Sequence, residues 1–150
     1  LIFIRHAYAP GNGDPINFNL NDCSTQRNLN EDGRKQARDI GEFFKKNKIK
    51  IDKVLSSEWC RCKETADIAF KDFSTNSFLN SFYSSKYAKN KDKQVKALND
   101  YIKKFESSKN LIFVTHYVMI SEVLNYSPSS GEIVVSDKNL NIIGTLEINF

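Results

Sequence analysis

The sequence of 150 residues lacks several features that would point to other classes of protein. It has no apolar run near the roughly 20 residues that a membrane-spanning helix needs. Its three cysteines, Cys23, Cys60 and Cys62, form no four-ligand zinc pattern, because a lone Cys-x-Cys pair supplies too few thiolates. It also has no Walker-type phosphate loop and no paired acidic metal site. The sequence therefore implies neither a membrane span nor a metal.

The charge balance is mildly positive, with a net charge of +4 that favours anionic partners such as phosphate esters. The lysines are scattered and do not interleave with aromatic residues, so they favour a solvated basic surface over a nucleic-acid site. Nucleic-acid binding would instead predict a steep salt dependence of affinity for DNA or RNA. The length and an apolar content of 40% fit a single domain, 1–150, with one core and no internal repeat.

Two short apolar runs, Leu1–Ile4 and Leu111–Val114, are typical of buried strands, and Ile51–Leu55 is predicted as a further short strand between them. Helical spacing of apolar residues predicts helices between and after them. The first predicted helix starts at Asn30, and the second covers Trp59–Phe70. The third runs from Val95 to Phe105, and the fourth covers Val118–Leu124. The alternation predicts an α/β fold, a three-layer α/β/α sandwich with a mostly parallel central sheet and helices on both faces. Alternating residues in Ile133–Val135 and Leu140–Ile148 add a C-terminal β-hairpin.

Two long segments have no regular pattern. Residues 7–28 contain Pro10, Gly11, Gly13 and Pro15 among many Asn and Asp residues, and residues 71–90 are rich in Ser, Asn, Phe and Tyr. Long loops in compact domains are usually functional. We expect these two segments to form the walls of a substrate site.

Polar side chains follow each of the three predicted strands directly, as Arg5-His6, Ser56-Ser57 and Thr115-His116. Because the carboxyl ends of parallel strands meet at one edge of a sheet, these residues should converge in space, where such folds bind their ligands. The chain has only two histidines, and both lie at this edge. That coincidence favours a functional role for His6 and His116 over a structural one.

Arg5 and Arg61 add two guanidinium groups to the two imidazoles, although Arg61 could instead form a surface ion pair with Glu58 or Glu64. Guanidinium groups match phosphate oxygens in a bidentate manner. A neutral imidazole can attack phosphorus in line while the positive groups neutralise the equatorial oxygens. The set therefore predicts a site for a dianionic phosphate that needs no metal.

Several segments then resemble one family, the histidine phosphatase (phosphoglycerate mutase-like) superfamily, and in particular its small bacterial branch. The similar segments are Leu1 to Ala7 for its Arg-His-Gly signature, Leu29 to Ala37 for Leu-x-x-x-Gly-x-x-Gln-Ala, Ser57 to Ala66 for Ser-x-x-x-Arg-x-x-x-Thr-Ala, and Val114 to His116 for the late histidine. The resemblance runs from residue 1 to about residue 124, in the family's order.

The resemblance implies that His6 is the phosphorylated nucleophile and that Arg5, Arg61 and His116 complete the phosphate pocket. Asn12 lies seven residues after Arg5, where many members place a phosphate contact. We also predict that Thr25 and Tyr117 contact the substrate. No cofactor is implied.

Two features depart from the family pattern. Ala7 stands where the family usually has Gly, and Phe78–Tyr83 has no carboxyl group where many members have their proton donor. Asp14, Asp22 and Glu58 are the alternative donors. With a donor, activity should depend on pH in a bell shape, whereas without one the alkaline side should stay flat.

The short chain favours hydrolysis over mutase chemistry. We therefore predict a phosphatase that acts on a phosphorylated small molecule or a phosphoprotein, and the alternative is a phosphate-binding regulatory module with little turnover. The small bacterial members that the sequence resembles include several that are exported, which slightly favours a periplasmic or exported location. In such a compartment Cys23 would pair with either Cys60 or Cys62. The oligomeric state stays open.

Overall fold

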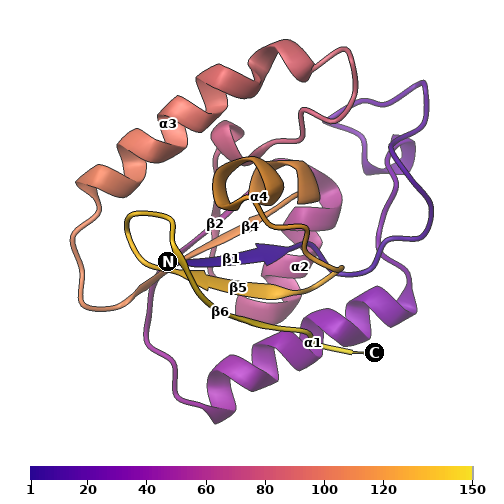
Figure 1. The fold of residues 1–150 in the computed structure, drawn as a ribbon. Helices are drawn as coiled ribbons and strands as arrows, with labels where there is room; N and C mark the ends of the chain where they lie inside the picture. The colour runs from indigo at the N-terminus through magenta and orange to yellow at the C-terminus, as the bar shows by residue number, and fades with distance from the viewer. Residues whose placement is uncertain (150) are drawn as a thin grey trace.

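A computed structural model describes residues 1–149, and its centre is one six-stranded sheet with the strand order β3-β2-β4-β1-β5-β6 (Figure 1). The strands are β1 (Ile2–Arg5), β2 (Ile51–Ser56), β3 (Ser74–Thr75), β4 (Asn110–Thr115), β5 (Ile133–Ser136) and β6 (Ile142–Leu146). The helices are α1 (Glu31–Lys46), α2 (Cys60–Phe70), α3 (Lys91–Lys104) and α4 (Tyr117–Leu124). Among the described residues, none of these helices is both long enough and apolar enough to cross a membrane.

The strands alternate their side chains between two apolar layers, which confirms the predicted α/β/α sandwich. Phe3 and Phe113 point to the layer that α3 and α4 cover, where ring centroids of the two phenylalanines lie 5.0 Å apart. Ile4 and Val114 point to the opposite layer, which α1 and α2 cover. The helices therefore lie on both faces of the sheet, as Figure 1 shows.

The first four strands in the sheet order run parallel, whereas β5 and β6 are antiparallel and form the predicted C-terminal hairpin. The sequence predicted only three parallel strands, and the structure adds β3 as a fourth. That strand has two exposed polar residues, Ser74 and Thr75, so no hydrophobic pattern marks it. Its pairing with Leu55 and Ser56 of β2 places it in the sheet.

Helix α1 begins where the sequence predicted. The side chain of Asn30 accepts a hydrogen bond from the backbone N–H of Gly33 at 2.9 Å, and Glu31 and Asp32 occupy the first turn. Lys45 and Lys46 occupy the last turn, where their charge complements the helix dipole.

Helix α1 also fixes the loop that leaves β1. A Cβ atom at Gly33 would lie 2.0 Å from the carbonyl oxygen of Tyr8, so only glycine permits this approach. Gln36, one turn later, accepts a hydrogen bond from the backbone N–H of Tyr8 at 2.9 Å and donates one to Ser130 O at 2.8 Å. The glycine and glutamine of this helix therefore hold the backbone directly after His6.

Candidate functional site

A cavity of about 430 Å³ lies at the carboxyl ends of β1 and β4, between the two long loops. It is lined by seven of the residues predicted for the site, which are Arg5, His6, Asn12, Asp14, Arg61, His116 and Tyr117. Residues from both predicted walls line it as well, among them Phe18 from the first loop and Tyr83 and Tyr87 from the second. The convergence expected from the strand ends is therefore present in the fold.

His6 is 2% exposed, and both of its ring nitrogens have a defined partner. Its Nδ1 lies 2.8 Å from the carbonyl oxygen of Ala7, which can only accept a hydrogen bond, so this nitrogen carries the proton. Its Nε2 accepts a hydrogen bond from Nε of Arg61 at 3.2 Å. Burial and then the charge of Arg61 lower the pKa of His6 well below its usual range. The imidazole is thus neutral near pH 7, with a lone pair on Nε2.

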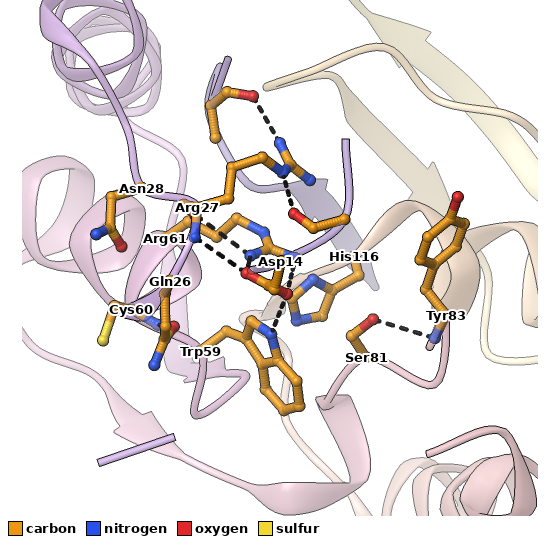
Figure 2. Close-up of polar contacts among 12 residues, drawn as sticks. Asp14, Gln26, Arg27, Asn28, Trp59, Cys60, Arg61, Ser81, Tyr83 and His116 are labelled. Carbon is orange, nitrogen blue, oxygen red and sulfur yellow. Dashed lines mark hydrogen bonds and ion pairs between the residues drawn. The ribbon is translucent and has the colours of Figure 1, made fainter. Parts of the chain in front are cut away.

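Arg61 lies at the start of α2, is 4% exposed, and pairs with Asp14 rather than with Glu58 or Glu64. Its two terminal nitrogens lie 2.8 Å and 3.4 Å from the oxygens of Asp14 (Figure 2). Asp14 also accepts hydrogen bonds from the backbone N–H of Arg27 at 3.0 Å and from the indole of Trp59 at 3.1 Å. Burial raises the pKa of Asp14, but these bonds and the charge of Arg61 outweigh it, so the pKa is lowered. Asp14 is therefore a carboxylate that braces Arg61.

Arg5 extends from the end of β1 toward the same space. One terminal nitrogen donates to Pro128 O at 2.9 Å, and the guanidinium lies 5.5 Å from the centroid of the Tyr117 ring. Its Nε is buried and has no hydrogen-bond partner in the described residues. An unpaired buried N–H is costly, so this atom is suited to receive an oxygen of a bound anion.

His116 follows β4 and has a polar network of its own. The hydroxyl of Ser57 donates to Oδ1 of Asn80 at 3.2 Å and lies 2.8 Å from Nε2 of His116. Since the single hydroxyl proton points to Asn80, Nε2 of His116 is the donor to Ser57. Burial, then Arg61 and His6, lower the pKa of His116 well below its usual range, so this imidazole is also neutral.

Thr65 connects the second arginine to the backbone beside the first histidine. Its hydroxyl donates to Arg61 O at 2.8 Å and accepts a hydrogen bond from the backbone N–H of Ala7 at 3.0 Å. In the segment Ser57 to Ala66, the serine therefore holds His116, the arginine faces His6 and the threonine holds Ala7. Arg61 and Thr65 are four residues apart in α2 and so lie on one side of the helix, whereas Ser57 precedes it.

Arg27 is a site residue that the sequence analysis did not single out. It lines the cavity and donates from its side chain to Gly13 O at 2.7 Å and to Ala9 O at 2.6 Å. Burial, and then the charge of Arg61, lower its pKa to about 10. With Arg5 and Arg61 it gives the cavity three guanidinium groups against one carboxylate, Asp14, and Lys86 adds a further charge. The cavity is therefore built for an anion of more than one charge.

Three predicted residues lie elsewhere. The hydroxyl of Thr25 bonds to Asn19 O at 3.1 Å and Asp22 O at 2.7 Å within the loop, and Thr25 does not line the cavity. Asp22 caps the short 3₁₀ helix η1 (Cys23–Thr25) through Ser24 N at 3.0 Å. Glu58 accepts a hydrogen bond from the side chain of Asn80 at 2.8 Å, also outside the cavity lining. Of the three candidate donors, the structure brings only Asp14 into the cavity.

A family model supplies the identity of the fold. The model of the histidine phosphatase superfamily (branch 1) matches residues 1–81, which is more than half of the chain. The chain belongs to this superfamily. A search of curated proteins gave no match.

Solved structures share the superfamily fold at low sequence identity. The protein histidine phosphatase SixA, solved with tungstate, matches with a TM-score of 0.62 and 15% identity over 97% of this chain and 94% of its own. A phosphoserine phosphatase from Entamoeba histolytica, solved with 3-phosphoglyceric acid, matches with a TM-score of 0.62 and 19% identity over 89% of this chain and 87% of its own. A mycobacterial glucosyl-3-phosphoglycerate phosphatase matches with a TM-score of 0.60 and 13% identity, also over 89% of this chain and 87% of its own.

Within this superfamily fold a disulfide ties the first loop to α2. Cys23 and Cys60 are bonded, whereas Cys62 is a buried free thiol. The sequence left open which of the two cysteines would pair with Cys23, and the structure selects Cys60. Cys62 instead lies 3.5 Å from Nε2 of His116, and burial raises the pKa of its thiol to about 12. The disulfide holds the loop that carries Asp14 and Arg27 against the helix that carries Arg61.

In residues 1–149 no group of three or more His, Cys, Asp or Glu side chains is placed to hold a metal ion. The positive charge of the cavity comes from three arginine side chains and Lys86.

Proposed function

We propose that this protein is a phosphatase that hydrolyses phosphate monoesters through a phosphohistidine on His6. The observation that carries the proposal is the state of the His6 ring. Its Nδ1 is held by Ala7 O, its pKa is lowered, and its Nε2 lone pair faces the guanidinium of Arg61. A neutral imidazole whose unprotonated nitrogen lies beside fixed positive charge is what attack on a phosphate dianion requires.

In the proposed reaction, Nε2 of His6 attacks phosphorus and the ester oxygen departs. Arg5, Arg27 and Arg61 neutralise the equatorial oxygens, and the unpaired Nε of Arg5 supplies one ready donor. A bound dianion also favours protonation of His116, which then becomes a further donor. Water finally attacks the phosphohistidine, which releases inorganic phosphate and restores His6.

The departure of the ester oxygen is the difficult step in this site. Asp14 accepts hydrogen bonds from Arg61, Arg27 and Trp59, and its lowered pKa keeps it ionised. It is therefore a poor general acid, and general acid help is typically worth about 10²–10⁴ in rate. We infer that the enzyme relies on substrates whose leaving groups need no protonation.

Metal independence and location are parts of the same proposal. Turnover needs no metal because arginine side chains supply the positive charge, and it should persist in the presence of a chelator. The Cys23–Cys60 disulfide fits an oxidising compartment, which supports a periplasmic or exported location. Intact-mass measurement of the secreted or periplasmic protein before and after reduction tests this, and three free thiols would contradict it.

The test of the proposed function is phosphate release from p-nitrophenyl phosphate in chelator, for the wild type and for His6→Ala. We expect wild-type turnover, loss of at least about 10³-fold in the variant, and phosphohistidine in acid-quenched wild type only. An unlabelled wild type that binds vanadate without turnover would instead identify a phosphate-binding regulatory module.

A further inference from the structure

The outer half of the cavity is an aromatic wall made of Phe18, Trp59 and Tyr87. Phe18 stacks on Trp59 with ring centroids 5.0 Å apart and planes 23° apart. Tyr87 packs edge-on against both rings, at 5.7 Å from Trp59 and 6.1 Å from Phe18. A fourth ring, Tyr83, is 67% exposed and also lines the cavity. This is far more aromatic surface than an inorganic phosphate can contact.

The aromatic wall adjoins the phosphate end of the cavity directly. Trp59 lies edge-on to His116 at 5.4 Å, and His116 lies edge-on to His6 at 5.6 Å. The indole N–H of Trp59 also donates to Asp14, which pairs with Arg61. Figure 2 shows Trp59 and Tyr83 on opposite sides of His116. A group attached to a phosphate at His6 therefore meets aromatic rings rather than open solvent.

The same cavity offers little help to a poor leaving group. Asp14 is the only carboxylate among the described residues that line it, and it is ionised. An alkoxide is about as basic as hydroxide, so it departs poorly unless an acid protonates it. A phenolate has a conjugate acid with a pKa of about 10, so it departs far more readily without a proton donor.

We propose that the substrates are aryl phosphates, the monoesters of phenols, which include phosphotyrosine. The ring is held by Phe18, Tyr83 and Tyr87 while the phosphate reaches the guanidinium groups, and this proposal rests on the proposed function of His6. Nε2 of His6 forms a bond to phosphorus as the phosphorus–oxygen bond breaks, and the phenolate leaves with the bonding pair and takes a proton from solvent. Water then attacks phosphorus, the phosphorus–nitrogen pair returns to His6, and the water's proton passes to solvent.

The experiment separates ring binding from leaving-group departure. Phenylphosphonate and cyclohexylphosphonate cannot be hydrolysed, so the ratio of their inhibition constants reports contact with the ring alone. We expect phenylphosphonate to inhibit roughly threefold to tenfold more tightly, as aromatic pairs allow. Phe18→Leu and Tyr83→Leu should each lower this ratio, whereas Phe43→Leu, at an aromatic residue of α1 outside the cavity, should not. Equal inhibition by the two phosphonates, or a ratio that neither cavity variant changes, would overturn the proposal.

Turnover supplies the second half of the test. Phenyl phosphate should be hydrolysed at least about 10²-fold faster than cyclohexyl phosphate, because only the phenolate departs without an acid. Similar rates for the two esters would overturn the aryl phosphate proposal even if phosphohistidine forms on His6. If no phosphohistidine forms on His6, the proposed function is overturned, and the ratio of phosphonate inhibition constants still reports whether the cavity prefers an aromatic ring. Free phosphotyrosine and a phosphotyrosine peptide then distinguish the sources. A peptide that is at least tenfold better in kcat/KM identifies a protein source, and equal values identify a small aryl phosphate.

Discussion

The inner end and the rim of the cavity are built differently. At the inner end, His6, Arg61 and His116 are each less than 5% exposed, and each is held by side chains from a different element. At the rim, Tyr83 is 67% exposed, and Ile16 is as exposed as in an extended chain. The inner end thus has one fixed geometry, whereas the rim has exposed side chains that can adapt. Under the proposed function, the inner end would set the chemistry and the rim would set the choice of substrate.

The strongest test of this contrast compares Arg61→Ala with Tyr83→Ala. Removal of Arg61 takes away a fixed positive group beside His6, so kcat for p-nitrophenyl phosphate should fall by about 10²–10³. Loss of Tyr83 removes only an exposed ring contact and should act mainly on KM. Steady-state kinetics of both variants, with circular dichroism as a check on folding, measures the difference. A kcat loss in Tyr83→Ala as large as that in Arg61→Ala would contradict the contrast.

Removal of the disulfide should have the next largest effect, because this bond holds the first loop against α2 at the inner end of the cavity. Cys23 and Cys60 are 37 residues apart, so closing this loop restricts the unfolded chain by about 4 kcal/mol in the entropic model. The double variant Cys23→Ser/Cys60→Ser should therefore lower the free energy of unfolding by about 2–4 kcal/mol in urea denaturation. Wild type in dithiothreitol is the matched control and should give the same value. A loss below about 1 kcal/mol would show that the loop is held by other contacts.

A pH series probes the two buried imidazoles. The pKa values of His6 and His116 are lowered in the folded protein, whereas in the unfolded chain they bind protons below about pH 6.5. The unfolded state then binds more protons, so stability falls as the pH falls below about 6.5 and continues to fall toward the folded pKa. We expect the free energy of unfolding to drop by about 2–3 kcal/mol between pH 7.5 and 5.5. His6→Asn should roughly halve this drop. An unchanged drop would contradict the lowered pKa of His6 in the folded protein.

Asp14→Asn should have the smallest effect and the most informative one. The change removes the only carboxylate among the described residues of the cavity lining, so vanadate should bind several-fold more tightly. It also weakens the brace on Arg61, so kcat should fall several-fold. Asp22→Asn, at a carboxylate outside the cavity, is the control and should change neither value. If Asp14 were the proton donor, kcat would fall far more and the alkaline side of the pH profile would lose its slope.

The sequence predicted the parts of the fold that packing determines. Strands β1 and β4 are buried on both faces, and so is the second half of β2 from Val54, so the pattern of these strands was visible. The residues that follow the three strands therefore had to meet. The cap at Asn30 and the charges at both ends of α1 marked that helix. Strand β3 was missed because its two exposed residues have no pattern of their own.

The sequence could not predict the contacts that residues 7–28 make in the cavity, because these contacts depend on the path of that loop. That loop has no periodicity, so nothing indicated that Asp14 would pair with Arg61 or that Arg27 would turn into the cavity. An arginine close after a Cys-Ser-Thr-Gln segment was the only signal for Arg27. The sequence likewise could not show whether Cys60 or Cys62 pairs with Cys23. Residues two apart on a helix point in nearly opposite directions, so the answer depends on which side of the helix faces the loop. One faces the loop and the other faces His116.

Strand β1 carries Arg5 and precedes His6, yet its partners in the sheet are β4 and β5, more than 100 residues later. During synthesis on the ribosome this strand has no sheet partner until residues near 115 have emerged, and it has both partners only after residue 136. Pairings so distant in sequence form slowly, because a long loop must close before they contribute any stability. The nascent chain therefore holds His6, the proposed nucleophile, beside an unfinished sheet, and activity should appear only when synthesis has passed β5.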